Sequence, residues 1–319
     1  MLKKIILFMI ISFSCFASDW PVYKGNLYFT GNNDEIIVKN NNLKWLFQAG
    51  SYVYNPIVSS GRVYFTDLNK IVYCLDEELG KLLWKLDLKQ YSAQFRSSSK
   101  AVAAGKVKYP LIFGNNLYIS DSTAIYCIDK IRGNIIWARV GAQETSAVNA
   151  VIDGIYSDPM ISGNHVYYGT RKLFLARDLF SGHLSWSNSC ISSYGGFPSY
   201  YDNIVFMQTK DLKKRKFFVY CLDSKTGSQK WAAELPNPMQ IFSPVVYQKK
   251  VYIPIEKSLH CLDLETGKKL WSAEYEDLIT TNPSFTDREI LFSVANRKIV
   301  SVSPETGKIT RELDFGFQA

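Results

Sequence analysis

Five aspartates recur at a fixed distance from a glycine and a tryptophan, in the pattern D-x-x-x-G-x-x-x-W. Carboxylates in such numbers could bind a metal ion or transfer protons. Because every copy keeps the same spacing, we interpret the Asp as an acceptor for turn N–H groups, the Gly as a residue with positive φ, and the Trp as a large apolar contact surface. The copies are Asp76-Gly80-Trp84, Asp129-Gly133-Trp137, Asp178-Gly182-Trp186, Asp223-Gly227-Trp231 and Asp263-Gly267-Trp271, and a degenerate sixth copy has Ser303, Gly307 and Arg311.

Thiols are the second candidate for chemistry. Cys74, Cys127, Cys221 and Cys261 each stand two residues before a motif Asp, where the other repeats have Ala176 and Ser301. Equivalent positions in different repeats should lie beyond the roughly 7 Å Cα limit for a disulfide. We therefore predict four free, buried thiols, with a redox or metal role as the alternative.

The remaining residue types suggest no active site. Cys190 has no evident partner, and His165, His183 and His260 fall in different repeats without the spacing of metal ligands. No nucleophile elbow, zinc-protease, phosphate-loop or dinucleotide motif is present in the sequence. We predict no catalytic, cofactor-binding or metal-binding residues.

A proline and an apolar-aromatic pair precede each motif and confirm the repeat. The prolines lie 28, 27, 27, 33, 27 and 28 residues before the Trp position. Each repeat is expected to form four short strands, A to D, with the motif as the C–D hairpin. The prolines are Pro56, Pro110, Pro159, Pro198, Pro244 and Pro283.

Repeats of this kind predict an all-β fold, a β-propeller of four-stranded blades in which neighbouring blades bury each other's faces. We expect seven blades, with six or eight as the alternatives. Residues 27–48 contribute to a further, partial blade, which the C-terminus could complete. One propeller is expected to span residues 18–319.

The first 17 residues have the layout of a secretory signal peptide. Lys3 and Lys4 precede a short apolar run, and small residues follow it. Two processing routes stay open: cleavage after Ala17, or lipid attachment at Cys15 as in a bacterial lipoprotein. Either route predicts export, to the periplasm or to the outer membrane that bounds it, and neither suggests a nucleic-acid partner.

Strand parity places the B–C turns and the D–A connections on one face of the propeller. The long connections fall there: 26 residues separate Trp84 from Pro110, 22 separate Trp137 from Pro159, and the fourth B–C turn is expanded. Loops that grow on one side of a rigid scaffold are typical of binding. The face is also basic, which predicts a partner-binding rim or a merely solubilising surface; its cations are Lys89, Arg96, Lys100, Lys106, Lys108, Lys213, Lys214, Arg215 and Lys216.

The hairpins resemble the PQQ-like repeat, most closely in Asp223-Ser-Lys-Thr-Gly227-Ser-Gln-Lys-Trp231 and Asp263-Leu-Glu-Thr-Gly267-Lys-Lys-Leu-Trp271. The segment from Asp19 to Gly31 is similar to the N-terminal signature of that family. The resemblance covers about residues 19–315. It is specific for the fold and weak for function, because the family includes quinoprotein dehydrogenases and non-catalytic propellers.

Among exported propellers of this size, the chain is most similar to the BamB-type component of the outer-membrane β-barrel assembly machinery. The resemblance implies a non-catalytic periplasmic scaffold, usually lipid-anchored, that binds the barrel assembly protein and needs no cofactor. The alternatives are a quinoprotein-like enzyme or small-ligand sensor that uses the central channel, and a surface adhesion module.

Overall fold

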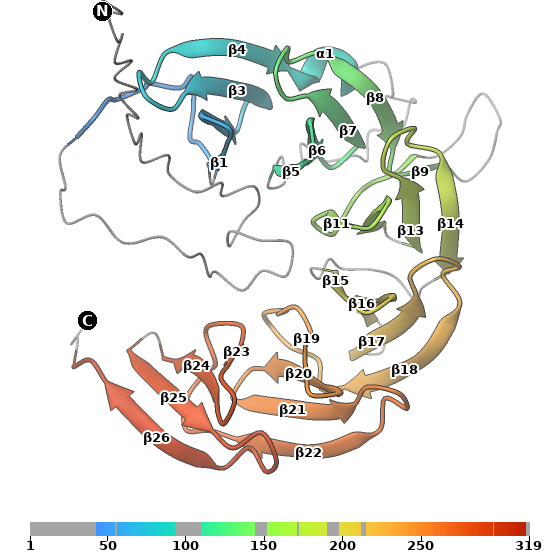
Figure 1. The fold of residues 1–319 in the computed structure, drawn as a ribbon. Helices are drawn as coiled ribbons and strands as arrows, with labels where there is room; N and C mark the ends of the chain where they lie inside the picture. Colours follow the sequence, from blue (N-terminus) through green and yellow to red (C-terminus); the bar gives the residue numbers. More distant parts are fainter. Residues whose placement is uncertain are drawn as a thin grey trace, which may run out of the picture.

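Six four-stranded antiparallel sheets follow one another in chain order around a ring that the described residues leave open between the last sheet and the first (Figure 1). The structure is a computed structural model of the 319-residue chain. It describes residues 43–54, 56–92, 110–143, 152–170, 172–189, 198–211, 215–295 and 297–316. The all-β propeller expected from the repeats is confirmed, since each repeat forms one blade whose strands lie in the order A-B-C-D.

The blades are numbered 1 to 6 in chain order, and each has four strands. Blade 1 has β1 (Ile57–Ser59), β2 (Arg62–Thr66), β3 (Ile71–Asp76) and β4 (Leu82–Asp87); blade 2 has β5 (Leu111–Phe113), β6 (Asn116–Ser120), β7 (Ala124–Asp129) and β8 (Ile135–Val140); blade 3 has β11 (Met160–Ser162), β12 (His165–Gly169), β13 (Leu173–Asp178) and β14 (Leu184–Ser189).

The second half of the ring repeats this arrangement. Blade 4 has β15 (Ser199–Tyr201), β16 (Ile204–Asp211), β17 (Lys216–Asp223) and β18 (Gln229–Leu235); blade 5 has β19 (Val245–Tyr247), β20 (Lys250–Ile255), β21 (Ser258–Asp263) and β22 (Lys269–Glu274); blade 6 has β23 (Ser284–Phe285), β24 (Ile290–Val294), β25 (Lys298–Val302) and β26 (Ile309–Asp314). Two additions lie between blades: the short helix α1 (Leu88–Ser92), and the paired strands β9 (Ala142–Gln143) and β10 (Ile152–Asp153).

The core lies between neighbouring sheets rather than within any one of them. Tyr64 and Val72 of blade 1 pack in one buried cluster with Leu117, Ile119 and Tyr126 of blade 2. The same arrangement recurs between the later blades. The alternating apolar and aromatic residues of strands B and C thus supply both faces of each sheet, so that a blade depends on its neighbours for stability.

Backbone hydrogen bonds separate the turns into two faces. Within blade 1 the C–D turn bonds the A–B turn, from Glu77 N to Gly61 O at 3.1 Å. On the opposite side, the end of strand D bonds the B–C turn, from Leu88 N to Lys70 O at 3.0 Å. We call the side of the A–B and C–D turns the hairpin face, and the side of the B–C turns and D–A connections the connection face.

Residues 43–54 extend the pattern beyond the six blades. Trp45 donates from Nε1 to the carbonyl of Glu77 at 2.8 Å and covers Gly80, the place that a strand D tryptophan of a preceding blade would take. Most of the partial blade expected over residues 27–48, with the signal segment 1–17 and Cys15, lies outside the described residues. A count of seven blades therefore stays a prediction, and Trp45 supports it.

The expected thiols are confirmed as free and buried at Cys74, Cys127, Cys221 and Cys261. Each pairs across strands with a motif tryptophan, as Cys221 does with Trp231. Burial raises the pKa of the Cys127 thiol to about 11 and the pKa of the Cys261 thiol to about 12. Buried thiols with raised pKa values are poor nucleophiles.

We predict that these four thiols are alkylated slowly in the native protein at pH 8 and completely once it is unfolded without reductant. Mass spectrometry of the alkylated peptides measures both states. Rapid native alkylation of two or more of the four, or a disulfide between any two of them, would contradict the described packing.

Candidate functional site

The motif aspartates accept hydrogen bonds from backbone N–H groups of their own turns. Asp223 Oδ1 accepts from the N–H groups of Lys225 and Thr226 at 3.0 and 2.9 Å, and from Thr226 Oγ1 at 3.0 Å. These bonds favour the ionised carboxylate and hold the pKa of Asp223 below its ordinary value. The following Gly227 has φ of +70°. The interpretation of the motif as a capped hairpin is supported at this position, and the carboxylate serves the turn.

Each motif tryptophan packs on the glycine of the next blade. Trp231 donates from Nε1 to the carbonyl of Leu264 at 2.9 Å, and a Cβ on Gly267 would lie 2.5 Å from the Trp231 ring. Only glycine leaves room for the indole. The same contact joins Trp45 to Gly80, Trp84 to Gly133, Trp137 to Gly182, Trp186 to Gly227, and Trp271 to Gly307.

The carbonyl that receives the indole also receives a tyrosine hydroxyl. Trp186 Nε1 and Tyr167 OH of blade 3 donate to Ser224 O of blade 4, at 2.9 and 3.2 Å. The tyrosine belongs to the apolar-aromatic pair of strand B. The sequence pattern indicated its apolar packing but not this hydrogen bond to the next blade. The same pairing occurs with Trp84 and Tyr64, Trp137 and Tyr118, and Trp271 and Tyr252.

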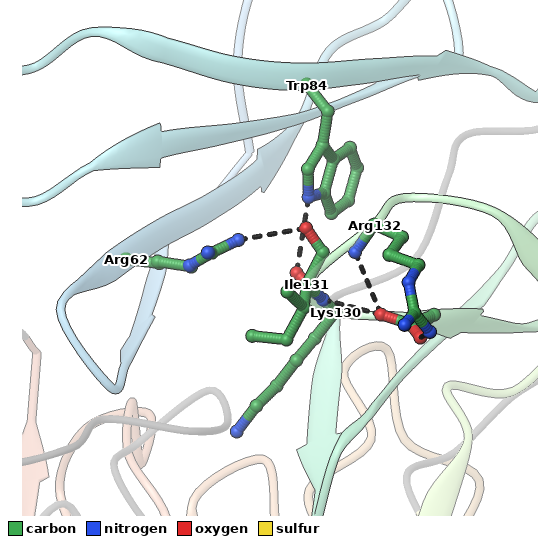
Figure 2. A network of polar contacts seen from close by, with 6 residues as sticks. Arg62, Trp84, Lys130, Ile131 and Arg132 are labelled. Atoms are coloured by element: carbon green, nitrogen blue, oxygen red, sulfur yellow. Dashed lines mark hydrogen bonds and ion pairs between the residues drawn. The ribbon is translucent and has the colours of Figure 1, made fainter.

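Figure 2 shows the tryptophan part of this contact between blades 1 and 2. Trp84 points from β4 toward the carbonyl of Lys130, and Arg62 reaches from β2 to the carbonyl of Ile131 at 3.0 Å. Arg132 N donates to Asp129 Oδ1 at 2.8 Å within the same turn. One hairpin is therefore held both by its own Asp and by two side chains of the preceding blade.

A buried ion pair joins the first two blades on the connection face. Lys70 Nζ lies 2.7 Å from Asp121 Oδ2, and both side chains are withdrawn from solvent. Asp121 Oδ1 also accepts from Thr123 N and Ala124 N, at 2.7 and 2.8 Å. Sequence reasoning missed this pair. The available signal was an Asp directly after strand B in the first two repeats, at Asp67 and Asp121.

The predicted basic rim is only partly within the described residues. Lys89 lies in α1, and Arg215 is exposed in the β16–β17 turn, both on the connection face. Lys216 forms an ion pair with Glu234 at 2.9 Å. The structure does not bring Lys89 together with the blade 4 residues, which belong to a different blade. Arg96, Lys100, Lys106, Lys108, Lys213 and Lys214 lie outside the described residues.

A braced loop accompanies the longer β16–β17 hairpin on this face. Lys210 Nζ donates to the carbonyls of Pro238 and Met239, and Met239 N donates to Glu256 of blade 5. Burial lowers the pKa of Lys210. The Met239 side chain is 92% exposed on this anchored loop. Hydrogen bonds from two blades therefore fix the exposed loop of Met239 on the connection face. The sequence had indicated only that the neighbouring B–C turn is expanded.

Two features bear on metal binding and on acid–base chemistry. Across residues 43–316 as far as they are described, no group of three or more His, Cys, Asp or Glu side chains is placed to hold a metal ion. His260 is buried, and desolvation lowers its pKa.

No helix in the described part of the chain is long and apolar enough to cross a membrane.

Comparison with known proteins adds a family and a fold. A family model described as "Outer membrane protein assembly factor BamB" matches residues 14–233 and 215–314. A protein of that name from Moranella endobia (strain PCIT) is 31% identical over 91 residues, which cover 28% of this chain and 23% of that protein. The alignment thus spans under a quarter of the relative's length.

Solved structures resemble the ring at low sequence identity. BamB from Moraxella catarrhalis superposes with a TM-score of 0.59 and 16% identity, over 80% of this chain and 73% of that one. Quinohemoprotein alcohol dehydrogenase ADHIIG from Pseudomonas putida HK5 gives 0.54 and 11%, over 93% and 72%. At these identities the likeness shows the propeller fold alone.

We predict that Gly267→Ala destabilises the fold by about 2–5 kcal/mol, because a Cβ adds a clash with Trp231 to the cost of positive φ. The control is Gly163→Ala in an A–B turn, where φ is +55° and no atom lies near the built Cβ. It should cost only about 1–2 kcal/mol. Equal losses in urea unfolding would show that the Trp–Gly contact contributes nothing.

We predict that Lys70→Met destabilises the protein by about 3–5 kcal/mol, because it leaves Asp121 buried without its cation. Lys70→Met combined with Asp121→Asn should recover much of that loss, since the neutral amide can still cap the turn. The unfolding free energies of the single and double variants measure the coupling. If the double variant is less stable than Lys70→Met alone, the ion pair is not the source of the effect.

Proposed function

The chain belongs to the BamB family of outer membrane protein assembly factors, and we propose from this membership that it is a non-catalytic scaffold for assembling outer-membrane β-barrel proteins. The match of the family model across both halves of the ring carries the proposal. The geometry supports it, because the recurring carboxylates and thiols serve turns and blade packing. The partner is a protein of the barrel assembly machinery, and no cofactor or nucleic acid takes part.

We place the protein in the periplasm after export by residues 1–17. It is either anchored to the outer membrane through a lipid on Cys15 or released after cleavage following Ala17. The apolar run preceded by Lys3 and Lys4 supports export. The two routes differ in mass, because a lipidated Cys15 carries acyl chains that a cleaved chain lacks.

The partner surface we propose is the connection face around blade 4. Three features support this choice: the long β16–β17 hairpin, the exposed Arg215 in its turn, and Met239 on a loop that blades 4 and 5 both hold. An anchored loop loses little conformational freedom on binding, and methionine adapts to varied apolar partners. Lys89, across the ring in blade 1, adds positive charge that would guide an acidic partner.

The alternative function is a quinoprotein-like enzyme, since alcohol dehydrogenases of that kind share the fold. The functions differ in what the protein binds. A scaffold recovers a protein from detergent-solubilised envelope and does not bind pyrroloquinoline quinone with calcium. An enzyme binds the quinone with calcium and recovers no protein partner, and a surface adhesion module recovers no component of the barrel assembly machinery.

We predict that Lys89→Glu with Arg215→Glu lowers partner recovery by about tenfold, since rim charges set the association rate and its salt dependence. Recovery by the unmodified chain should also fall as ionic strength rises. The matched control is Lys81→Glu with Lys225→Glu on the hairpin face. Should the control abolish recovery while the first pair leaves it intact, the partner surface has been assigned to the wrong face.

A further inference from the structure

Apolar side chains stand at the tips of the C–D turns in blades 1 to 3. Leu79, Ile131 and Phe180 are 72%, 46% and 55% exposed. Leu82, Leu83, Ile136 and Leu184, on the adjoining stretches of strand D, are also exposed. We call these seven residues the apolar arc. Single exposed apolar residues are ordinary on protein surfaces, whereas a run through three neighbouring blades is not.

The turn tips of blades 4 to 6 are polar, with Thr226, Thr266 and Thr306 at the position of Leu79. The turn position of Ile131 and Phe180 is held by Lys225, Glu265 and Glu305 in blades 4 to 6. The difference lies in the turns and not on strand D, because Leu270 of blade 5 and Ile309 of blade 6 are 50% and 46% exposed at the positions of Leu83 and Leu82. The hairpin fold tolerates charge at the turn tips, so the fold does not require the apolar tips of blades 1 to 3.

The turns have no freedom to withdraw these tips. Asp178 Oδ1 accepts from Phe180 N at 3.2 Å and from Ser181 N at 2.8 Å, which fixes the turn beneath Phe180. Trp84 packing on Gly133, and Trp137 packing on Gly182, hold each turn beside the strand D of the blade before it. The turn tips of the arc are therefore held at fixed positions on the hairpin face.

The described chain begins on this same face. Lys44 pairs with Glu78 at 2.6 Å, and Trp45 donates to Glu77, both in the C–D turn of blade 1. The 42 residues before Leu43, with Cys15 among them, thus join the ring beside Leu79.

Charge around the arc is nearly balanced. Cations and acids both lie around its turn tips, which favours an apolar contact over electrostatic attraction. The cations are Lys44, Arg62, Lys81, Lys130, Arg132 and Arg139, and the acids are Asp76, Glu77, Glu78, Asp129 and Asp178.

We propose that the apolar arc rests on a phospholipid surface, with its tips inserted at the boundary between headgroups and acyl chains. Side chains at fixed turn tips reach that depth without any change of backbone conformation. This orientation leaves the connection face directed away from the lipid. The contact does not depend on the protein partner proposed above, and each can fail without the other.

The test is flotation of the full chain with vesicles of phosphatidylethanolamine and a minor share of phosphatidylglycerol. Every variant carries Cys15→Ser, so that no acyl anchor contributes. Leu79→Ser, Ile131→Ser and Phe180→Ser together should lower the vesicle-bound fraction at least about tenfold, because three apolar tips are lost. The matched control, Lys225→Ser, Glu265→Ser and Glu305→Ser, should float as the parent does, and thermal unfolding should show both triple variants folded.

Four results would overturn the proposal. The parent chain fails to float, or the control loses flotation as much as the arc variant does. Flotation that disappears at high salt would indicate electrostatic adsorption in place of apolar insertion. An arc variant that floats normally but no longer recovers a protein from solubilised envelope would make the arc a protein interface.

Discussion

The fold depends on one contact, in which the strand D tryptophan of each of blades 1 to 5 covers the hairpin glycine of the next blade. The indole N–H donates to a backbone carbonyl of the same turn, as Trp231 does to Leu264 at 2.9 Å. Its ring occupies the space that any Cβ on the glycine would need. A turn carbonyl that would otherwise be buried unpaired is thereby satisfied, and a large apolar surface is removed from water. Each blade is thus stabilised by the blade before it.

This dependence explains why the two faces differ. On the hairpin face, every C–D turn presents a Gly and a backbone carbonyl to the preceding blade, and all but the Ser303 turn keep the Asp, so variation is greatest at the tips. On the connection face no such contact constrains length, and the β16–β17 hairpin and the loop of Met239 extend from it. The proposed lipid contact uses the variable tips of the first face, and the proposed protein contact uses the variable loops of the second.

The repeat itself made much of the fold predictable. Asp, Gly and Trp have roles that follow from their chemistry, and five complete copies with a degenerate sixth, all at one spacing, place them on equivalent hairpins. The shared carbonyl was harder to foresee, because Tyr167 and Phe206 look alike as apolar aromatics and only the tyrosine donates a hydrogen bond. The pairing of Lys70 with Asp121 joins residues 51 positions apart, which no local pattern specifies. Loop length pointed to the connection face, but the anchoring of Met239 by Glu256 depends on a neighbouring blade.

The most direct test of the central claim is hydrogen–deuterium exchange of the chain, free and bound to the protein recovered from solubilised envelope. A scaffold that binds through its connection face should gain protection in residues 207–219 and 236–242. The C–D turns of blades 4 to 6 should exchange unchanged, since they lie on the other face. Protection confined to those turns, or to the channel-side strands β1, β5, β11, β15, β19 and β23, would contradict the account.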